Sequence, residues 1–191
     1  NGVRSDRRLI ALLDGTELRS AFHLNAGCFG GVTPGGGHPR LTAAEAVSLY
    51  ADTPHEVAAH SYTHPFLEQL PEGGAAMELL RDRETLEPLF SRMVRGFSYP
   101  MGTYNAAVVE TVRRCGFAYG RTTADTHGFS LPEEPLTLRP TCRHRDPALP
   151  QLCREFLDRD PKWSNLLFFL WGHSYEFEES GNWAVMERFC R

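Results

Sequence analysis

Basic side chains are too few in this chain of 191 residues to outweigh the acidic ones. Twenty lysines and arginines stand against 24 aspartates and glutamates, so the formal net charge is -4 at pH 7. A protein that binds nucleic acid in a general way needs an excess of positive charge to neutralise phosphates. We therefore expect no nucleic acid among the partners of this protein.

Cysteines with the spacing of a thiolate zinc site are also absent. The five cysteines are scattered, odd in number and never arranged as C-x-x-C. This pattern suits free thiols in a reducing compartment better than a disulfide framework, and it predicts a cytoplasmic location. The longest apolar run, 166–171, is far too short to cross a bilayer, so we expect no membrane span.

Short apolar segments alternate with amphipathic helical patterns along the whole chain, which is typical of a parallel sheet with helical crossovers. No G-x-G-x-x-G fingerprint follows a strand, so a distorted or incomplete (β/α) barrel is favoured over a dinucleotide-binding sheet. We expect one domain over residues 1–191. The expected helices are 6–13, 43–50, 77–90, 105–115, 147–157 and 182–190, and the expected strands are 20–25, 56–60, 96–99, 117–122, 136–139 and 166–173.

Three local patterns sharpen these expectations. Thr42 and Glu45 have the spacing of a capping box at the start of the helix 43–50. Gly116 can take the left-handed conformation that ends the helix 105–115. The near-continuous apolar run 166–171 predicts a strand that is buried on both faces.

Two histidines leave the end of the strand 56–60 together. His60 ends this strand, and His64 follows four residues later, directly before Pro65. A proline disfavours helical backbone in the residue before it, so we expect His64 in a loop. Two imidazoles in this arrangement can hold one divalent metal if a carboxylate completes the set, although two ordinary loop histidines would have the same spacing.

Other polar residues follow the ends of other expected strands. Tyr99 ends the strand 96–99, Met101 follows it, and His173 ends the strand 166–173. The carboxyl ends of the strands of a β/α barrel open on one rim, where active sites are built. We therefore expect these residues to meet His60 and His64 there.

The chain resembles the polysaccharide deacetylases of carbohydrate esterase family four, which contain the NodB-homology domain. His60-Ser61-Tyr62-Thr63-His64-Pro65 matches the metal motif H-[ST]-x-x-H-P of that family. The segment 98–105 is similar to its groove motif R-x-P-Y-G-x-x-N, with Ser98 in place of the arginine and Met101 in place of the tyrosine. Leu170-Trp171-Gly172-His173 is similar to its late leucine-histidine motif.

The first motif of the family, T-F-D-D-G, is represented only by its end. Asn1-Gly2 aligns with the final Asp-Gly, so the position of the carboxylate metal ligand holds Asn1. The first barrel strand and the aspartate that serves the family as catalytic base are not in the sequence. Asp6 is a poor substitute, because we expect its helix to lead away from the rim.

The resemblance implies a role for each candidate residue. His60, His64 and the Asn1 position would hold one divalent metal ion, expected to be zinc, and His173 would donate a proton to the leaving nitrogen. The backbone N–H of Met101 would stabilise the oxyanion, and the same resemblance makes Tyr99, Tyr104 and Arg139 candidates for substrate binding. His173 could instead be a structural histidine that is paired with Glu176.

Three functions remain open at this point. The first is metal-dependent hydrolysis of an N-acetyl or O-acetyl group on an amino sugar or polysaccharide. The second is a degenerate domain of this fold that binds carbohydrate without turnover, which the absent base and Asn1 favour. The third is a different barrel metallohydrolase such as an amidohydrolase, but its H-x-H pair on the first strand is not evident.

Overall fold

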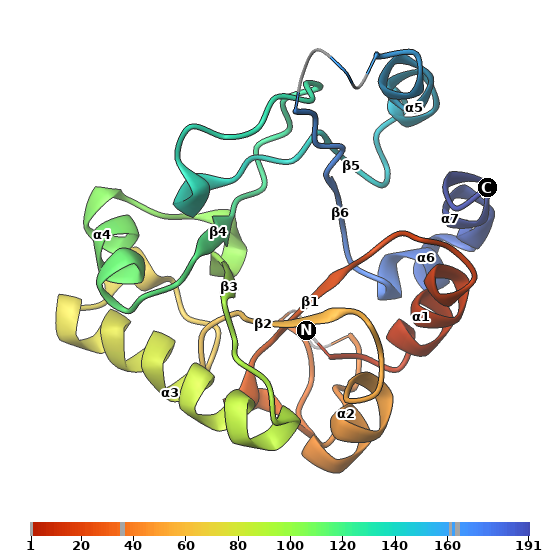
Figure 1. Ribbon diagram of the computed structural model, residues 1–191. Coiled ribbons are helices and arrows are strands. Elements are labelled where there is room, and N and C mark those ends of the chain that lie inside the picture. The colour runs from red at the N-terminus through yellow and green to blue at the C-terminus, as the bar shows by residue number, and fades with distance from the viewer. Residues whose placement is uncertain (1, 35–36, 161, 163–164) are drawn as a thin grey trace.

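The strands of this protein form two parallel sheets, as seen in a computed structural model that describes residues 2–34, 37–160, 162 and 165–191 (Figure 1). The larger sheet has the order β1-β2-β3-β4. A second sheet pairs β5 with β6. The strands are β1 (Ala21–Leu24), β2 (Glu56–Ala59), β3 (Gly96–Ser98), β4 (Tyr119–Arg121), β5 (Cys142–Arg143) and β6 (Leu170–Trp171).

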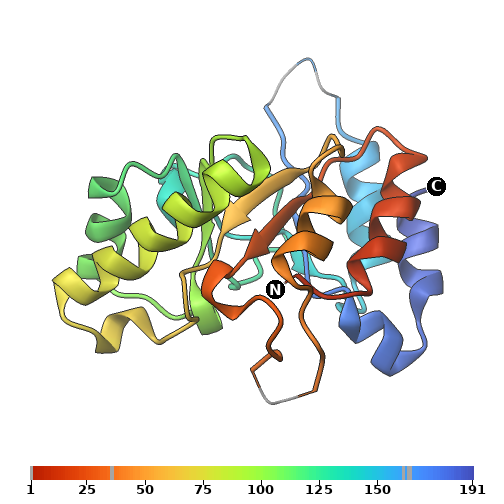
Figure 2. The same ribbon diagram turned by 90° about the horizontal axis from the view of Figure 1, so that it is seen from below.

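Helices lie around the outside of these strands (Figure 1). Figure 2 shows α2 and α3 lying over β1 and β2, and the four parallel strands are linked by the crossovers that parallel pairing requires. The helices are α1 (Asp6–Asp14), α2 (Ala43–Tyr50), α3 (Glu72–Phe90), α4 (Ala106–Arg114), α5 (Leu149–Leu157), α6 (Tyr175–Ser180) and α7 (Trp183–Phe189). The described residues also contain four single 3-10 turns, which are Ala26–Cys28, Leu67–Gln69, Pro100–Gly102 and Pro135–Thr137.

This architecture confirms the expected α/β fold with parallel strands. The two sheets are not hydrogen-bonded into one ring within the described residues, so the barrel is open there. Among those residues, too, no helix has the length and apolar character needed to span a bilayer. All five cysteines are free thiols.

The main core lies between the large sheet and helices α2, α3 and α4. Phe22, Val57 and Phe97 from three neighbouring strands are almost completely buried there, together with Leu79 and Leu86 of α3. Removing side chains of this size from water contributes about 1.5–3 kcal/mol each. The packing fixes the position of the strands, and therefore the direction in which their carboxyl ends point.

The expected caps are present. The Thr42 hydroxyl accepts a hydrogen bond from the backbone N–H of Glu45, and the Glu45 carboxylate accepts one from the backbone N–H of Thr42 at 2.8 Å. Asn105 caps α4 by accepting from the N–H of Val108. Gly116 has the left-handed φ of +77° that was expected after this helix.

Some expected boundaries were wrong. Helix α3 begins at Glu72 and not at residue 77, so it includes Gly73 and Gly74, whose low helix propensity is overridden by the packing of Ala75 and Leu79. The expected strand 136–139 is a 3-10 turn followed by one parallel bridge between Arg121 and Leu138. The sequence patterns predicted neither the two-residue strand β5 nor helix α6.

The apolar run 166–171 also differs from the prediction. Only Leu170–Trp171 forms a strand, and all six residues are half-buried. The reason is a cavity of about 460 Å³ that separates this segment from Ala21 and His23 of β1. The run has the composition of a strand that is covered on both faces, but one face borders this cavity.

Candidate functional site

His60 and His64 turn their ring nitrogens toward each other. The two Nε2 atoms are 3.1 Å apart, and the ring planes cross at 78°. His60 is buried at the end of β2, and His64 lies in the loop that follows. The structure therefore brings the two expected metal-binding histidines together.

Ser98 determines which nitrogen of His60 is available. The Nδ1 atom of His60 lies 2.8 Å from the backbone oxygen of Ser98 and 2.7 Å from its hydroxyl oxygen. A carbonyl oxygen can only accept a hydrogen bond, so Nδ1 carries the proton and Nε2 keeps its lone pair. Burial also lowers the pKa of His60 well below its ordinary value, which favours the neutral imidazole that a metal needs.

The loop 61–64 has a backbone that side-chain-bearing residues rarely adopt. Ser61 has a φ of +62° and His64 a φ of +64°. Such left-handed residues cost free energy and are typical of functional sites. Burial lowers the pKa of His64 to about 4, so this ring is neutral at pH 7 as well.

Two buried residues hold this loop in place. The Asn25 amide, directly after β1, donates to the backbone oxygens of His60 and Ser61. The Asp82 carboxylate on α3 accepts from the backbone N–H of His60 at 2.9 Å and from that of Ala26 at 2.7 Å. Both residues are at most 1% exposed. The site is thus fixed by the ends of β1 and β2 and by a core helix.

The two imidazoles fit a divalent metal as two of its ligands. The Nε2 atoms of the two neutral rings lie side by side, and a carbonyl fixes the tautomer of His60, as is usual for metal-binding histidines. The described residues contain no group of three or more side chains that could hold a metal. The expected third ligand, Asn1, lies outside the described residues.

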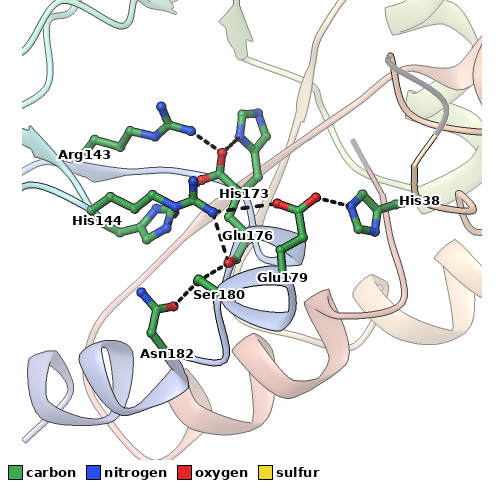
Figure 3. A network of polar contacts seen from close by, with 9 residues as sticks. His38, Arg143, His144, His173, Glu176, Glu179, Ser180 and Asn182 are labelled. Carbon is green, nitrogen blue, oxygen red and sulfur yellow. Dashed lines mark hydrogen bonds and ion pairs between the residues drawn. The ribbon is translucent and has the colours of Figure 1, made fainter.

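His173 follows β6 and is paired with a carboxylate (Figure 3). Its Nδ1 lies 3.3 Å from Oε1 of Glu176, and the same oxygen accepts from Arg143. Burial raises the pKa of Glu176, but the hydrogen bond and charge of His173 and the charge of Arg143 outweigh it and bring the value to about 2. His173 therefore faces a permanently charged carboxylate above this pH.

A small cavity connects His173 with the metal-binding loop. It has a volume of about 90 Å³ and is lined by His23, His60, Arg121, His173 and Tyr175, among others. Burial lowers the pKa of His173, and its bond to Glu176 opposes this shift. His60 and His173 thus border one polar space, as their positions at strand ends predicted.

The residues expected to contact the substrate differ in burial, and they do not all lie at the rim. Tyr99 is only 1% exposed and donates its hydroxyl hydrogen to the backbone oxygen of Leu136 at 2.8 Å, so its side chain belongs to the core and not to the rim. Tyr104 packs against Tyr99 with 39% of its surface exposed. Met101 follows β3 in left-handed backbone with φ +57°. Arg139 is exposed and borders neither of the two cavities described above.

Sequence reasoning missed Arg121. This residue ends β4, lines both cavities and is the register partner of Ser98 on β3. Ser98 holds the motif position where the family has arginine, and Arg121 lies beside it on the next strand. The strand-end criterion that selected His60 and His173 could have found it.

Asp6 lies closer to the site than its helix led us to expect, because it borders the small cavity. Both oxygens of its carboxylate, however, already accept hydrogen bonds. One accepts from the hydroxyl of Ser174, and the other accepts from the N–H of Val3 and the hydroxyl of Tyr50. These contacts make Asp6 a structural carboxylate.

Comparisons with known proteins agree with this architecture. The deacetylase PplD of Streptococcus pyogenes, solved with acetate, superposes with a TM-score of 0.61 at 19% identity over 73% of this chain and 59% of that one. IcaB of Ammonifex degensii gives a TM-score of 0.56 at 23% identity over 65% and 57%. A CE4 family pseudoenzyme of Bacillus anthracis, BA3943, gives 0.56 at 16% identity over 100% and 59%.

These superpositions show a shared fold, and the chain spans less than 60% of the length of each of these structures. No curated protein sequence matches the chain. The sequence model of the polysaccharide deacetylase family, in contrast, matches residues 3–120, which is more than half of the chain. On this match, the chain belongs to the polysaccharide deacetylase family.

Proposed function

We propose that this protein hydrolyses an N-acetyl or O-acetyl group of an amino sugar or polysaccharide with the help of one divalent metal ion. The family supports deacetylation of carbohydrate as the class of reaction. The observation that carries the metal dependence is the 3.1 Å separation of the Nε2 atoms of His60 and His64. Two neutral imidazoles at this distance can act together as ligands of one cation.

His60 and His64 would hold the metal, with the Asn1 position as the third ligand. An ion such as Zn²⁺ supplies a Lewis acid that polarises the acyl carbonyl. The protein contributes the neutral state of both rings, through burial, and the tautomer of His60, through Ser98. An amide oxygen at position 1 carries no charge, so we expect weaker zinc binding than with the carboxylate of the family motif.

His173 is the proposed general acid. In amide hydrolysis the oxygen of water forms a bond to the acyl carbon, the C–N bond breaks, and the departing nitrogen takes up a proton. Glu176 at 3.3 Å from Nδ1 stabilises the protonated ring and leaves Nε2 as the donor to the substrate. The backbone N–H of Met101 is the proposed oxyanion donor, and the exposed ring of Tyr104 the proposed substrate contact.

A second candidate is a carbohydrate-binding domain without turnover. Hydrolysis needs a group that takes the proton of water, and Asp6, the carboxylate beside the small cavity, is fully engaged in structural hydrogen bonds. The motif position for the metal carboxylate holds asparagine. One structure with this fold is itself described as a CE4 family pseudoenzyme.

Acetate release and zinc binding, measured on the same preparation, separate the two candidates. The protein is incubated with partially acetylated chitin oligosaccharides or acetylxylan after loading with Zn²⁺, and released acetate is quantified. We expect release that chelation abolishes and zinc restores. Zinc binding without any release of acetate would favour the carbohydrate-binding domain, and absence of zinc binding would contradict the metal-dependent mechanism.

A further inference from the structure

We infer that the guanidinium of Arg121 is a carboxylate-binding group of the candidate active site and holds the acetate anion that deacetylation releases. The choice of acetate as the natural ligand rests on the proposed function. The carboxylate site itself rests on the surroundings of Arg121, which are independent of any reaction.

Arg121 lies where the two cavities meet. Its side chain lines the polar cavity of about 90 Å³ together with His60 and His173, and it also lines the apolar cavity of about 460 Å³. A single water needs roughly 10–15 Å³ of such space. The polar cavity therefore has room for an anion as small as acetate directly beside the guanidinium.

The guanidinium lacks a charged partner among the residues that the structure describes. Within the described part of the chain it makes neither a hydrogen bond nor an ion pair, and its one side-chain contact of note is the ring of Trp171, 5.4 Å away. The two carboxylates that line these cavities have other partners: Glu56 accepts from Tyr119, and Asp6 accepts from Tyr50 and Ser174.

An arginine in this position favours an anion for electrostatic reasons. Arg121 is half-buried, so its guanidinium has lost part of its contact with water, and a carboxylate would offset this cost. Burial lowers the pKa of Arg121 to about 10, which still leaves the group charged at neutral pH. The neighbouring rings of His23, His60 and His173 are neutral or positive, so none of them can supply the missing negative charge.

The shape of the guanidinium selects a carboxylate among small anions. Its N–H groups form a planar fork that matches the two oxygens of a carboxylate. Hydrolysis of an acetyl group produces such a carboxylate, and the proposed proton donor His173 borders the same cavity. Arg121 is therefore placed to receive the acid product.

Acetate binding to the metal-free protein tests this inference. Sodium acetate is titrated into chelator-treated protein while sodium chloride keeps the ionic strength constant. The backbone amide signals of residues 60, 121 and 173, which line the polar cavity, are followed in ¹H–¹⁵N spectra of every variant, and the Nε–Hε signal of Arg121 is followed in the wild type. We expect these signals to shift with acetate. The affinity for acetate should fall at least about tenfold in Arg121→Met, as for the loss of a charged hydrogen bond, and less in Arg121→Lys, which keeps the charge but not the fork.

Arg154→Met is the matched control, because Arg154 is exposed on α5. It should bind acetate as the wild type does. Backbone spectra establish that the variants are folded, and Arg121→Lys alone carries the comparison if Arg121→Met is not. Acetate affinity that is unchanged by the substitution of Arg121, or a wild-type signal that does not respond to acetate, would overturn the inference.

The outcome is separable from that of the proposed function. Acetate binding is measured without metal and without turnover, so a negative result there says nothing against zinc binding or acetate release. Conversely, if the protein binds acetate through Arg121 but releases no acetate from any substrate, these results contradict only the proposed reaction.

Discussion

The Nε2 atoms of His60 and His64 lie 3.1 Å apart although the two residues are four positions apart in an irregular loop. This distance depends on two unusual backbone conformations, at Ser61 and at His64 itself. Both rings are kept neutral by burial. The two rings are thus in the protonation state that metal binding requires, and single substitutions can test the contribution of each residue.

Replacing either histidine by alanine should abolish specific zinc binding. We expect His60→Ala and His64→Ala each to weaken zinc by more than about 100-fold, beyond the loss seen when a group behind a metal ligand is removed. Isothermal titration calorimetry measures the affinity, and the rise of the melting temperature with zinc should disappear. His127→Ala, in an exposed loop, is the control and should bind zinc normally.

Ser98→Ala should have a much smaller effect on zinc. The substitution removes the hydroxyl that lies 2.7 Å from Nδ1 of His60, but the backbone oxygen at 2.8 Å remains and keeps the proton on that nitrogen. We expect zinc affinity to fall less than about tenfold. A loss as large as that of His60→Ala would mean that the hydroxyl, and not the carbonyl, fixes the tautomer.

Glu176→Gln should shift the pH dependence of deacetylation. The carboxylate stabilises protonated His173, so its neutral replacement lowers the pKa of this ring. The acid form is then lost at lower pH, and the alkaline limb of kcat/KM should move down by about one pH unit. An unchanged limb would indicate that His173 is not the proton donor.

The free energy of unfolding should fall in acid partly because Glu176 becomes protonated. The pKa of Glu176 is about 2 in the folded protein against an ordinary value of 4.5, so the stability that it contributes is complete above pH 4.5 and is lost as the pH falls toward 2. Urea unfolding at several pH values measures this loss. The curve of Glu176→Gln should be flatter between pH 4.5 and 2 and lower at neutral pH.

Gly172→Ala should destabilise the protein. A Cβ atom at residue 172 would lie 1.9 Å from Nδ1 of His144, which is itself buried. The ring of His144 or the chain before His173 must move, at a cost of about 1–3 kcal/mol. Gly37→Ala is the control, because Gly37 is exposed and a Cβ atom there would meet no neighbour. Gly181 also has open space around it, but its positive φ would strain an alanine.

Much of the site could be predicted because it depends on local chemistry. The apolar residues before His60 indicated a strand, Pro65 indicated a loop at His64, and parallel strands bring their carboxyl ends to one edge. Thr42 with Glu45 likewise specified a helix start that the structure confirms. In each case the residues that carry the signal also make the contact.

The remaining features depend on distant parts of the chain. Tyr99 and Tyr104 look alike in the sequence, yet only Tyr99 is covered, because the segment around Leu136 packs over it. Arg121 lies near the end of the expected strand 117–122 and Arg139 ends the expected strand 136–139, and only the sheet order places Arg121 beside the histidines. The partial exposure of 166–171 depends on a cavity that no local pattern encodes.

The ties that Asn25 and Asp82 make to the backbone at His60 have a thermodynamic consequence for ligand binding. Asn25 and Asp82 reach the loop from β1 and α3, and their bonds exist without any ion. The conformational entropy of the loop is therefore lost when the chain folds and not when a cation arrives. Association at this site should resemble insertion into a rigid chelator, with little change in heat capacity and no gain in helicity.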